Sequence, residues 1–261
     1  MPWERLQAVT FQLELSTGAT RPCVFTCEDH TGQTSGDFVV KLRSEVRGKE
    51  TGLLFEFLAA QLALRLGIPT PQPVLIELGD ALADGLTDPV IADRVRASKG
   101  LNFGTKFLAP GYVTWRVNDA IPVALRQVAT EILAFDAVID NADRRRAKPN
   151  LLWKDDELYI FDHELAFAFT RVLGAVPLPF TEESLRFLRD HPLYHGLRKQ
   201  TVDLRRFTGE LESLQDDELD DLLRGVPPEF GTLYLERIQQ WLVSARDRAQ
   251  SLAVAIGSIL Q

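Results

Sequence analysis

The spacing of hydrophobic positions predicts that the first part of the chain consists mainly of strands. Alternating or short apolar runs between turn-like residues are typical of strands. Three such runs lie between residues 7 and 42, and two more follow at 74–78 and 103–108. Residues 50–66, ETGLLFEFLAAQLALRL, repeat instead with a helical period and end at Gly67, with PTPQP behind it as a helix breaker.

Helical periodicity dominates from about residue 121 onward. The predicted helices cover residues 123–140, 182–190, 199–214, 216–224 and 232–260. The segments NLLW and ELYIFD, which follow the first of these helices, are typical of a short pair of strands. The chain thus divides into about 110 residues of sheet with one long helix and a remainder that is mainly helical, which is an α+β pattern.

Composition and charge narrow the class of protein. The 261 residues are 45% hydrophobic and 25% charged, as in a globular protein with room for one two-lobed domain or two small domains. A formal charge of −8 argues against a general binder of nucleic acid or anionic membranes, because phosphate groups attract positive charge. Two cysteines build no disulfide framework, MPWERLQAV lacks the apolar core of a signal peptide, and no apolar run approaches the ~20 residues that cross a bilayer. We therefore expect a cytoplasmic protein.

A lysine on a strand and a glutamate on a helix stand where charge is costly. Lys41 interrupts the apolar strand FVVKL, and Glu56 lies among leucines and phenylalanines of the 50–66 helix. A buried carboxylate is expensive unless a cation meets it. Lys41 alone would be read as the solvent-facing member of the alternation. Together, the two residues predict a strand-to-helix ion pair that fixes the lysine against a phosphate, an arrangement that kinases use.

A crowded polar loop follows the 123–140 helix. The stretch FDAVIDNADRRRAKPNLL carries Asp143 and Asn150, and the second of the two short strands leads to Asp162 in YIFDHELAF. In phosphoryl transfer one aspartate takes or orients the hydroxyl proton, and an asparagine and a later aspartate hold Mg²⁺. Asp162 alone is equally well explained as a cap on the next turn. The order lysine, glutamate, aspartate, asparagine, aspartate predicts a phosphotransferase.

The loop STGATRP, residues 16–22, lies between two predicted strands. A loop of small residues can turn backbone N–H groups toward phosphate oxygens. The candidates for that contact are Thr17, Gly18, Ala19 and Thr20. With only one glycine, the loop by itself reads first as a plain hairpin turn.

Several stretches together resemble the HipA-like kinase family, in its stand-alone bacterial branch. They run in family order from about residue 10 to 170: STGATRP, FVVKL, LLFEFLAAQLALRLGIPTPQPVLIEL, NFGTKFL, FDAVIDNADRRRAKPNLL and IFDHELAF. The resemblance implies a bilobal protein-kinase-like fold, with a β-rich N-lobe over residues 1–110 and a helical C-lobe over residues 111–261. It implies ATP- and Mg²⁺-dependent phosphorylation of a serine or threonine hydroxyl on an unidentified protein substrate. It leaves open an antitoxin-like or regulatory protein partner.

The resemblance also implies roles for individual residues. The family's phosphate-positioning pair, catalytic base and metal-binding aspartate fall on Lys41, Glu56, Asp143 and Asp162. The stretch FGTKFL falls where the hinge strand would meet adenine, so Lys106 and Phe107 are candidates for nucleotide binding.

One position departs from the family pattern. The metal-binding asparagine usually lies five residues after the catalytic aspartate, but that position is Lys148, and the available amide is Asn150. The stand-alone branch tends to read Asn-Pro-Asn where this chain reads Lys-Pro-Asn. We expect Asn150 to take over as metal ligand. Alternatively, Lys148 neutralises phosphate in place of one metal ion, or the protein is a catalytically weak nucleotide-binding module that senses ATP or holds a partner.

Other interpretations explain fewer residues. A metal-dependent hydrolase built on Asp143, Asp162 and His163 leaves the lysine and glutamate of the predicted ion pair without a purpose. Cys23 and Cys27 have too few potential ligands nearby for a zinc site and are expected to be buried thiols. The run of arginines at residues 144–146 is either a solvated loop or a contact to phosphate or substrate.

Overall fold

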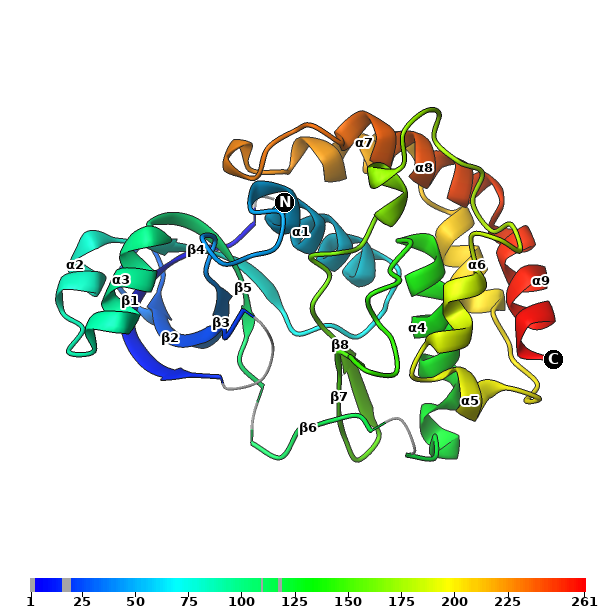
Figure 1. Ribbon diagram of the computed structural model, residues 1–261, viewed down its shortest axis with the longest axis horizontal. Helices are drawn as coiled ribbons and strands as arrows, with labels where there is room; N and C mark the ends of the chain where they lie inside the picture. The colour runs from blue at the N-terminus through cyan, green and yellow to red at the C-terminus, as the bar shows by residue number, and fades with distance from the viewer. Residues whose placement is uncertain (1–2, 16–19, 109, 117–118) are drawn as a thin grey trace.

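Five strands near the N-terminus close into a barrel at one end of the molecule (Figure 1). The computed structural model describes residues 3–15, 20–108, 110–116 and 119–261. The barrel strands, in the order in which they pair, are β1 (Arg5–Glu14), β2 (Cys23–Glu28), β3 (Thr34–Lys41), β5 (Gly100–Lys106) and β4 (Pro73–Leu78). Neighbouring strands are antiparallel, except that β4 returns parallel to β1. The five predicted strands are therefore present.

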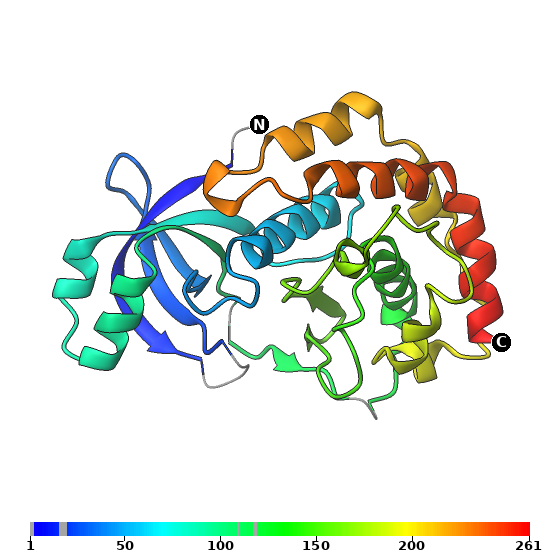
Figure 2. The same ribbon diagram turned by 45° about the horizontal axis from the view of Figure 1, so that its top comes forward.

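Helix α1 (Glu50–Arg65) lies between the barrel and the helices of the C-terminal part (Figure 2). It is apolar on nearly every side, because one side packs on β4 and β5 and another on α7. Gly52 permits the close packing of the preceding loop, since a Cβ there would lie 2.2 Å from the carbonyl oxygen of Arg47. The contacts on both sides hold α1, and with it Glu56, in one position.

Two short helices, α2 (Asp80–Asp84) and α3 (Pro89–Ala97), connect β4 to β5. The sequence pattern predicted no helix there, so the expectation of one helix in the first 110 residues was wrong. The side chain of Asp88 caps α3 by accepting hydrogen bonds from the backbone N–H groups of Val90 and Ile91. Ile91 and Val95 then join the apolar interior of the barrel. A short polar helix with few apolar positions carries too weak a periodic signal to be detected.

The C-terminal part is helical, as the sequence predicted, but with different boundaries. Its helices are α4 (Arg126–Val138), α5 (Tyr194–Leu197), α6 (Arg205–Glu212), α7 (Asp216–Arg224), α8 (Leu235–Asp247) and α9 (Ala249–Leu260). The predicted helix at 232–260 is broken at Arg248, and the one at 199–214 begins only at Arg205. The predicted helix at 182–190 is only a 3-10 turn, Arg186–Asp190. No helix in the described ranges is long and apolar enough to cross a membrane.

A small antiparallel sheet links the barrel to the helices. Its strands are β6 (Val113–Thr114), β7 (Leu151–Lys154) and β8 (Glu157–Ile160). The predicted strand pair is confirmed, with Leu151 opposite Ile160. This register places Asn150 just before β7 and Asp162 two residues beyond β8, at the same end of the hairpin.

The two cysteines face the closed interior of the barrel. Cys23 and Cys27 are fully buried in an apolar cluster that also contains Phe25 and Phe38. Burial raises the pKa of Cys23 to about 11 and the pKa of Cys27 to about 12. The predicted buried thiols are confirmed, and the His, Cys, Asp and Glu side chains that cluster closely enough for a metal ion in the described ranges include neither cysteine.

Alkylation of these thiols tests the closed barrel. Because the thiolate is the reactive form, we expect native protein at pH 8 to react with iodoacetamide roughly a hundredfold or more slowly than protein unfolded in guanidinium. Mass spectrometry of quenched samples gives both rates. Rapid labelling of both cysteines in the native protein would show that the barrel opens in solution.

Candidate active site

The side chain of Lys41, at the end of β3, reaches α1 and the loop after β8. Its Nζ forms an ion pair with Glu56 and lies 2.5 Å from Oδ1 of Asp162. The strand-to-helix ion pair expected from the sequence is therefore present. Glu56 is buried, and one carboxylate oxygen also accepts a hydrogen bond of 2.9 Å from the backbone N–H of His163. Burial acts to lower the pKa of Lys41, but the two carboxylates outweigh it and hold that pKa above its ordinary value.

Lys148 joins the two aspartates of the site. Its Nζ lies 2.7 Å from Oδ2 of Asp143 and 2.8 Å from Oδ2 of Asp162. Each oxygen of the Asp162 carboxylate therefore contacts an ammonium group. Burial acts to raise the pKa of Asp162, but Lys41 and Lys148 together hold it well below its usual range. Asp162 is consequently ionised at neutral pH.

The loop that carries Asp143 is built on a buried carboxylate, Asp136 of α4. Oδ2 of Asp136 accepts hydrogen bonds from Nε of Arg144 at 2.6 Å and Nε2 of His191 at 2.9 Å, and Oδ1 accepts one from Asn141 at 3.0 Å. The Asn141 side chain in turn accepts the backbone N–H of Asp143. Arg144 is thus a buried structural residue and neither a solvated side chain nor a phosphate contact. These hydrogen bonds hold the loop that carries Asp143 in place against α4.

Arg144 also ties Asn150 to the strand that leads to Asp162. One of its Nη atoms donates to the backbone carbonyls of Asn150 and Phe161, at 2.5 and 3.1 Å. Asn150 and Asp162 both have positive φ angles, 49° and 62°, which turn the chain sharply at the end of the hairpin. Nδ2 of Asn150 is buried and has no hydrogen-bond partner among the described residues.

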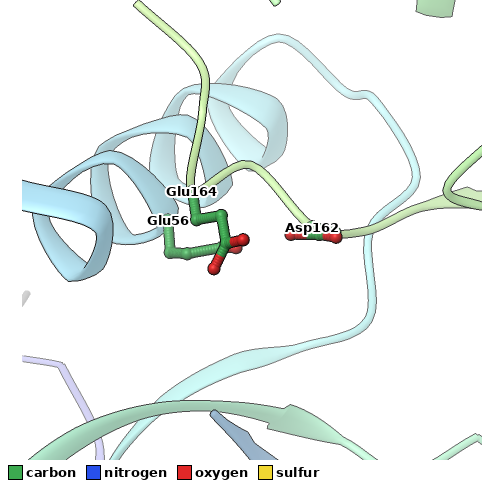
Figure 3. Close-up of side chains that lie close together, drawn as sticks. All are labelled: Glu56, Asp162 and Glu164. Atoms are coloured by element: carbon green, nitrogen blue, oxygen red, sulfur yellow. The ribbon is translucent and has the colours of Figure 1, made fainter. Parts of the chain in front are cut away.

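Glu164 is a buried carboxylate that the sequence reasoning missed. Glu56 on α1 and Asp162 and Glu164 on the loop after β8 direct their carboxylates toward one another, within 4.8 Å (Figure 3). Glu164 lies 3.9 Å from Lys41 and, on its other side, 3.9 Å from Nε of Arg47. Burial, only partly offset by Lys41, raises its pKa. A signal was available, since Glu164 lies two residues after Asp162 and directly before the apolar stretch LAFAF.

The negative charges of the four acids in this site exceed the positive charges of its two lysines. In their ionised forms Glu56, Asp143, Asp162 and Glu164 outnumber the ammonium groups of Lys41 and Lys148. Arg47, whose Nε lies 3.9 Å from Glu164, offsets one of these charges, and the negative charge that remains in a partly buried site favours binding of a cation. The close group that could hold a metal ion in the described ranges contains Asp162 but neither Asp143 nor His163, the other two residues of the hydrolase interpretation.

Thr20, Lys106 and Phe107 do not join the contacts described above. Thr17, Gly18 and Ala19 fall outside the described residues, and Thr20 lies in the turn before β2. Lys106 donates to the backbone carbonyl of Ser35 at 2.9 Å and lies over the ring of Phe38. Phe107 is partly exposed beyond the end of β5. Their roles in nucleotide binding stay predictions.

A barrel is followed by helices, and a lysine on a strand is paired with a glutamate on a helix, as in protein kinases. The sequence profile of HipA-like kinases matches residues 9–174, more than half of the chain, so the chain belongs to the HipA-like kinase family. The resemblance inferred from its motifs is confirmed. The crystal structure of the Helicobacter pylori proinflammatory kinase CtkA is similar, with a TM-score of 0.51 and 13% identity over 97% of this chain and 100% of that chain. At this identity the likeness shows the fold alone. No curated protein matches the sequence.

Proposed function

We propose that the chain is an ATP- and Mg²⁺-dependent protein kinase that phosphorylates a serine or threonine hydroxyl. The family supports a kinase-type phosphotransferase in general. The observation that carries the finer proposal is the unbroken series of contacts from Glu56 through Lys41, Asp162 and Lys148 to Asp143. These residues come from a helix, a strand and two loops that match the places where kinases hold phosphates, base and metal.

The proposed arrangement is bilobal. A β-rich N-lobe spans residues 1–110 and a mainly helical C-lobe spans residues 111–261. One cluster of buried apolar side chains fills the barrel, and a second surrounds α4 and the C-terminal helices and also takes in α1 of the proposed N-lobe. Lys41 then belongs to the N-lobe and Asp143 to the C-lobe, so the nucleotide phosphates would lie where the two lobes meet.

The proposed chemistry assigns a role to each charged group. Lys41, held by Glu56, positions the phosphates of ATP. Asp143 accepts the proton of the substrate hydroxyl as the hydroxyl oxygen attacks the γ-phosphorus. A new oxygen–phosphorus bond forms, the bond from the γ-phosphorus to the β,γ-bridging oxygen breaks, and ADP leaves with that electron pair.

We propose Asp162 and Asn150 as the magnesium ligands. Mg²⁺ prefers carboxylate and amide oxygens, and Asp162 supplies an ionised carboxylate. Asn150 would contribute its amide oxygen; the buried atom that has no partner among the described residues is Nδ2, which is a hydrogen-bond donor and does not bind metal. When bound there, Mg²⁺ would offset the negative charge of the phosphates. For the rest of the nucleotide we propose backbone contacts from the loop at residues 17–20 and contacts from Lys106 and Phe107 near adenine.

A catalytically weak nucleotide-binding module is the second candidate. The contact of Lys148 with both Asp143 and Asp162 favours this module, because the same ammonium group pairs with the proposed base and with the proposed metal ligand. The two functions differ in turnover. A kinase transfers labelled phosphate from ATP to protein, whereas the module binds ATP and leaves it intact.

Thermal stabilisation by Mg²⁺–ATP tests both candidates against the absence of any nucleotide site. Ligand at about 100 times Kd is expected to stabilise the protein by roughly 2.7 kcal/mol. For a chain of this size that raises Tm by roughly 5–10 °C. Lys41→Met removes most of the shift because it deletes the phosphate contact. Lys99→Met, which alters an exposed lysine paired with Asp80, serves as the control.

Two outcomes of this experiment are decisive. A folded protein whose Tm does not respond to any nucleotide would rule out both candidates. A clear shift accompanied by transfer of γ-labelled phosphate to protein, with the modified residue mapped as serine or threonine, supports the kinase and rules out the inert module.

A further inference from the structure

Lys148 occupies a place where a kinase would hold a cation. It lies five residues after Asp143, and its ammonium group bridges Asp143 and Asp162 at 2.7 and 2.8 Å. Kinases hold two Mg²⁺ ions, one of them through the asparagine of the catalytic loop. We infer that Lys148 replaces one of these ions, so that the nucleotide-bound site holds a single divalent cation. This inference rests on the proposed function and specifies how many divalent ions the same site binds.

The backbone around Lys148 is held in place. The N–H of Lys148 donates to the carbonyl of Arg145 at 2.8 Å, and its carbonyl accepts the N–H of Arg145 at 3.2 Å. The N–H of Arg146 donates to the carbonyl of Asp190 at 2.8 Å, which fastens the turn to the helical part. Pro149 follows and restricts the chain further. The backbone position of Lys148 is therefore fixed, and its side chain reaches the two aspartates from that fixed position.

The ammonium group of Lys148 is partly enclosed by the acids of the site, with 26% of its side chain exposed, and contacts the carboxylates of both aspartates. It therefore lies between the proposed base and the proposed metal-binding aspartate, where a cation offsets negative charge. The four acids of the site exceed its three cations, Lys41, Lys148 and Arg47, by one charge, and the phosphates of the nucleotide add negative charge that a divalent ion offsets. Asp162 and Asn150 offer one carboxylate and one amide for that ion.

Counting bound ions tests this inference directly. Mn²⁺ replaces Mg²⁺ as a paramagnetic probe, and electron paramagnetic resonance measures free Mn²⁺ during titration of the protein saturated with the β,γ-imido analogue of ATP. We expect one Mn²⁺ per wild-type chain. Lys148→Asn restores an amide at the usual position and is expected to bind two. The wild-type count does not depend on whether the variant folds.

Affinity for nucleotide without metal provides a second readout. A resident ammonium group contacts phosphate in the absence of any divalent ion, so the wild type binds the analogue in the presence of a chelator. Loss of one charged contact is expected to weaken that binding about tenfold or more in Lys148→Asn. Lys99→Asn, the same substitution at an exposed lysine, leaves both the ion count and the metal-free affinity unchanged.

The outcomes separate this inference from the proposed function. Two Mn²⁺ ions in the wild type overturn the single-ion inference even if the protein is an active kinase. An unchanged ion count and unchanged metal-free affinity in folded Lys148→Asn overturn it as well. Failure of the wild type to bind the analogue under any condition removes the proposed function, and the inference with it.

Discussion

Replacing Asp143 with asparagine is expected to lower the rate of phosphoryl transfer by about 10²- to 10⁴-fold, the usual contribution of a positioned proton acceptor. The amide keeps the size of the side chain and still accepts a hydrogen bond from Lys148, but it removes the base and its charge. Asp143 has no contact with Lys41, so binding of Mg²⁺–ATP survives. Single-turnover transfer of γ-labelled phosphate gives the rate, and calorimetric titration gives the affinity.

Asp162→Asn is expected to lower both the rate of phosphoryl transfer and the affinity for Mg²⁺–ATP. Asp162 contacts Lys41 and Lys148 and is a proposed metal ligand, so loss of its charge weakens nucleotide binding as well as turnover. Asp221→Asn, in an exposed ion pair with Arg224, controls for the substitution itself. Equal loss of nucleotide binding in the Asp143 and Asp162 variants would show that their roles are assigned wrongly.

The second large effect is on stability, at Asp136. This carboxylate is fully buried and accepts hydrogen bonds from Arg144, Asn141 and His191. Asp136→Ala leaves the buried guanidinium of Arg144 without its counter-charge, a change that costs about 3–5 kcal/mol in other proteins. Since domains are stable by only about 5–15 kcal/mol, we expect Tm to fall by roughly 10 °C or more. Calorimetry or circular dichroism during heating measures this.

The control for Asp136 is an ion pair on the surface. Asp221→Ala breaks the exposed pair with Arg224 and leaves Tm nearly unchanged, because exposed pairs contribute little. The double variant Asp136→Ala with Arg144→Met removes both buried charges and recovers part of the lost stability. If Asp136→Ala alone melts like the wild type, the bonds seen beneath the loop do not stabilise it.

The elements that carry the site were predictable where the local signal is strong. Helix α1 is apolar on nearly every side and ends just before Gly67, whose φ of 68° suits glycine; the N–H of Ile68 then donates a hydrogen bond to the carbonyl of Ala63. The strand before Lys41 and the hairpin before Asp162 also have clear apolar runs. Each of these elements therefore places a charged residue at a predictable point along the chain.

Boundaries in the C-terminal part depended on packing and could not be read from periodicity. The apolar pattern continues through Arg248, yet the backbone leaves the helix there, at φ −114° and ψ 17°, and the side chain reaches the carbonyl of Pro179. A long-range contact of this kind overrides the weak helical preference of a single residue.

The sequence alone determined the kinds of residue in the site, their order along the chain and the family, because these depend on local patterns. Only the tertiary structure decided which charges meet. Lys41 and Asp162 lie 121 residues apart in sequence but 2.5 Å apart in space, and Lys148 contacts both aspartates. It likewise decided that Arg144 is buried and that Glu164 joins the site. The strength of an ion pair depends on the distance between its charges and on their burial, and packing of the whole chain sets both.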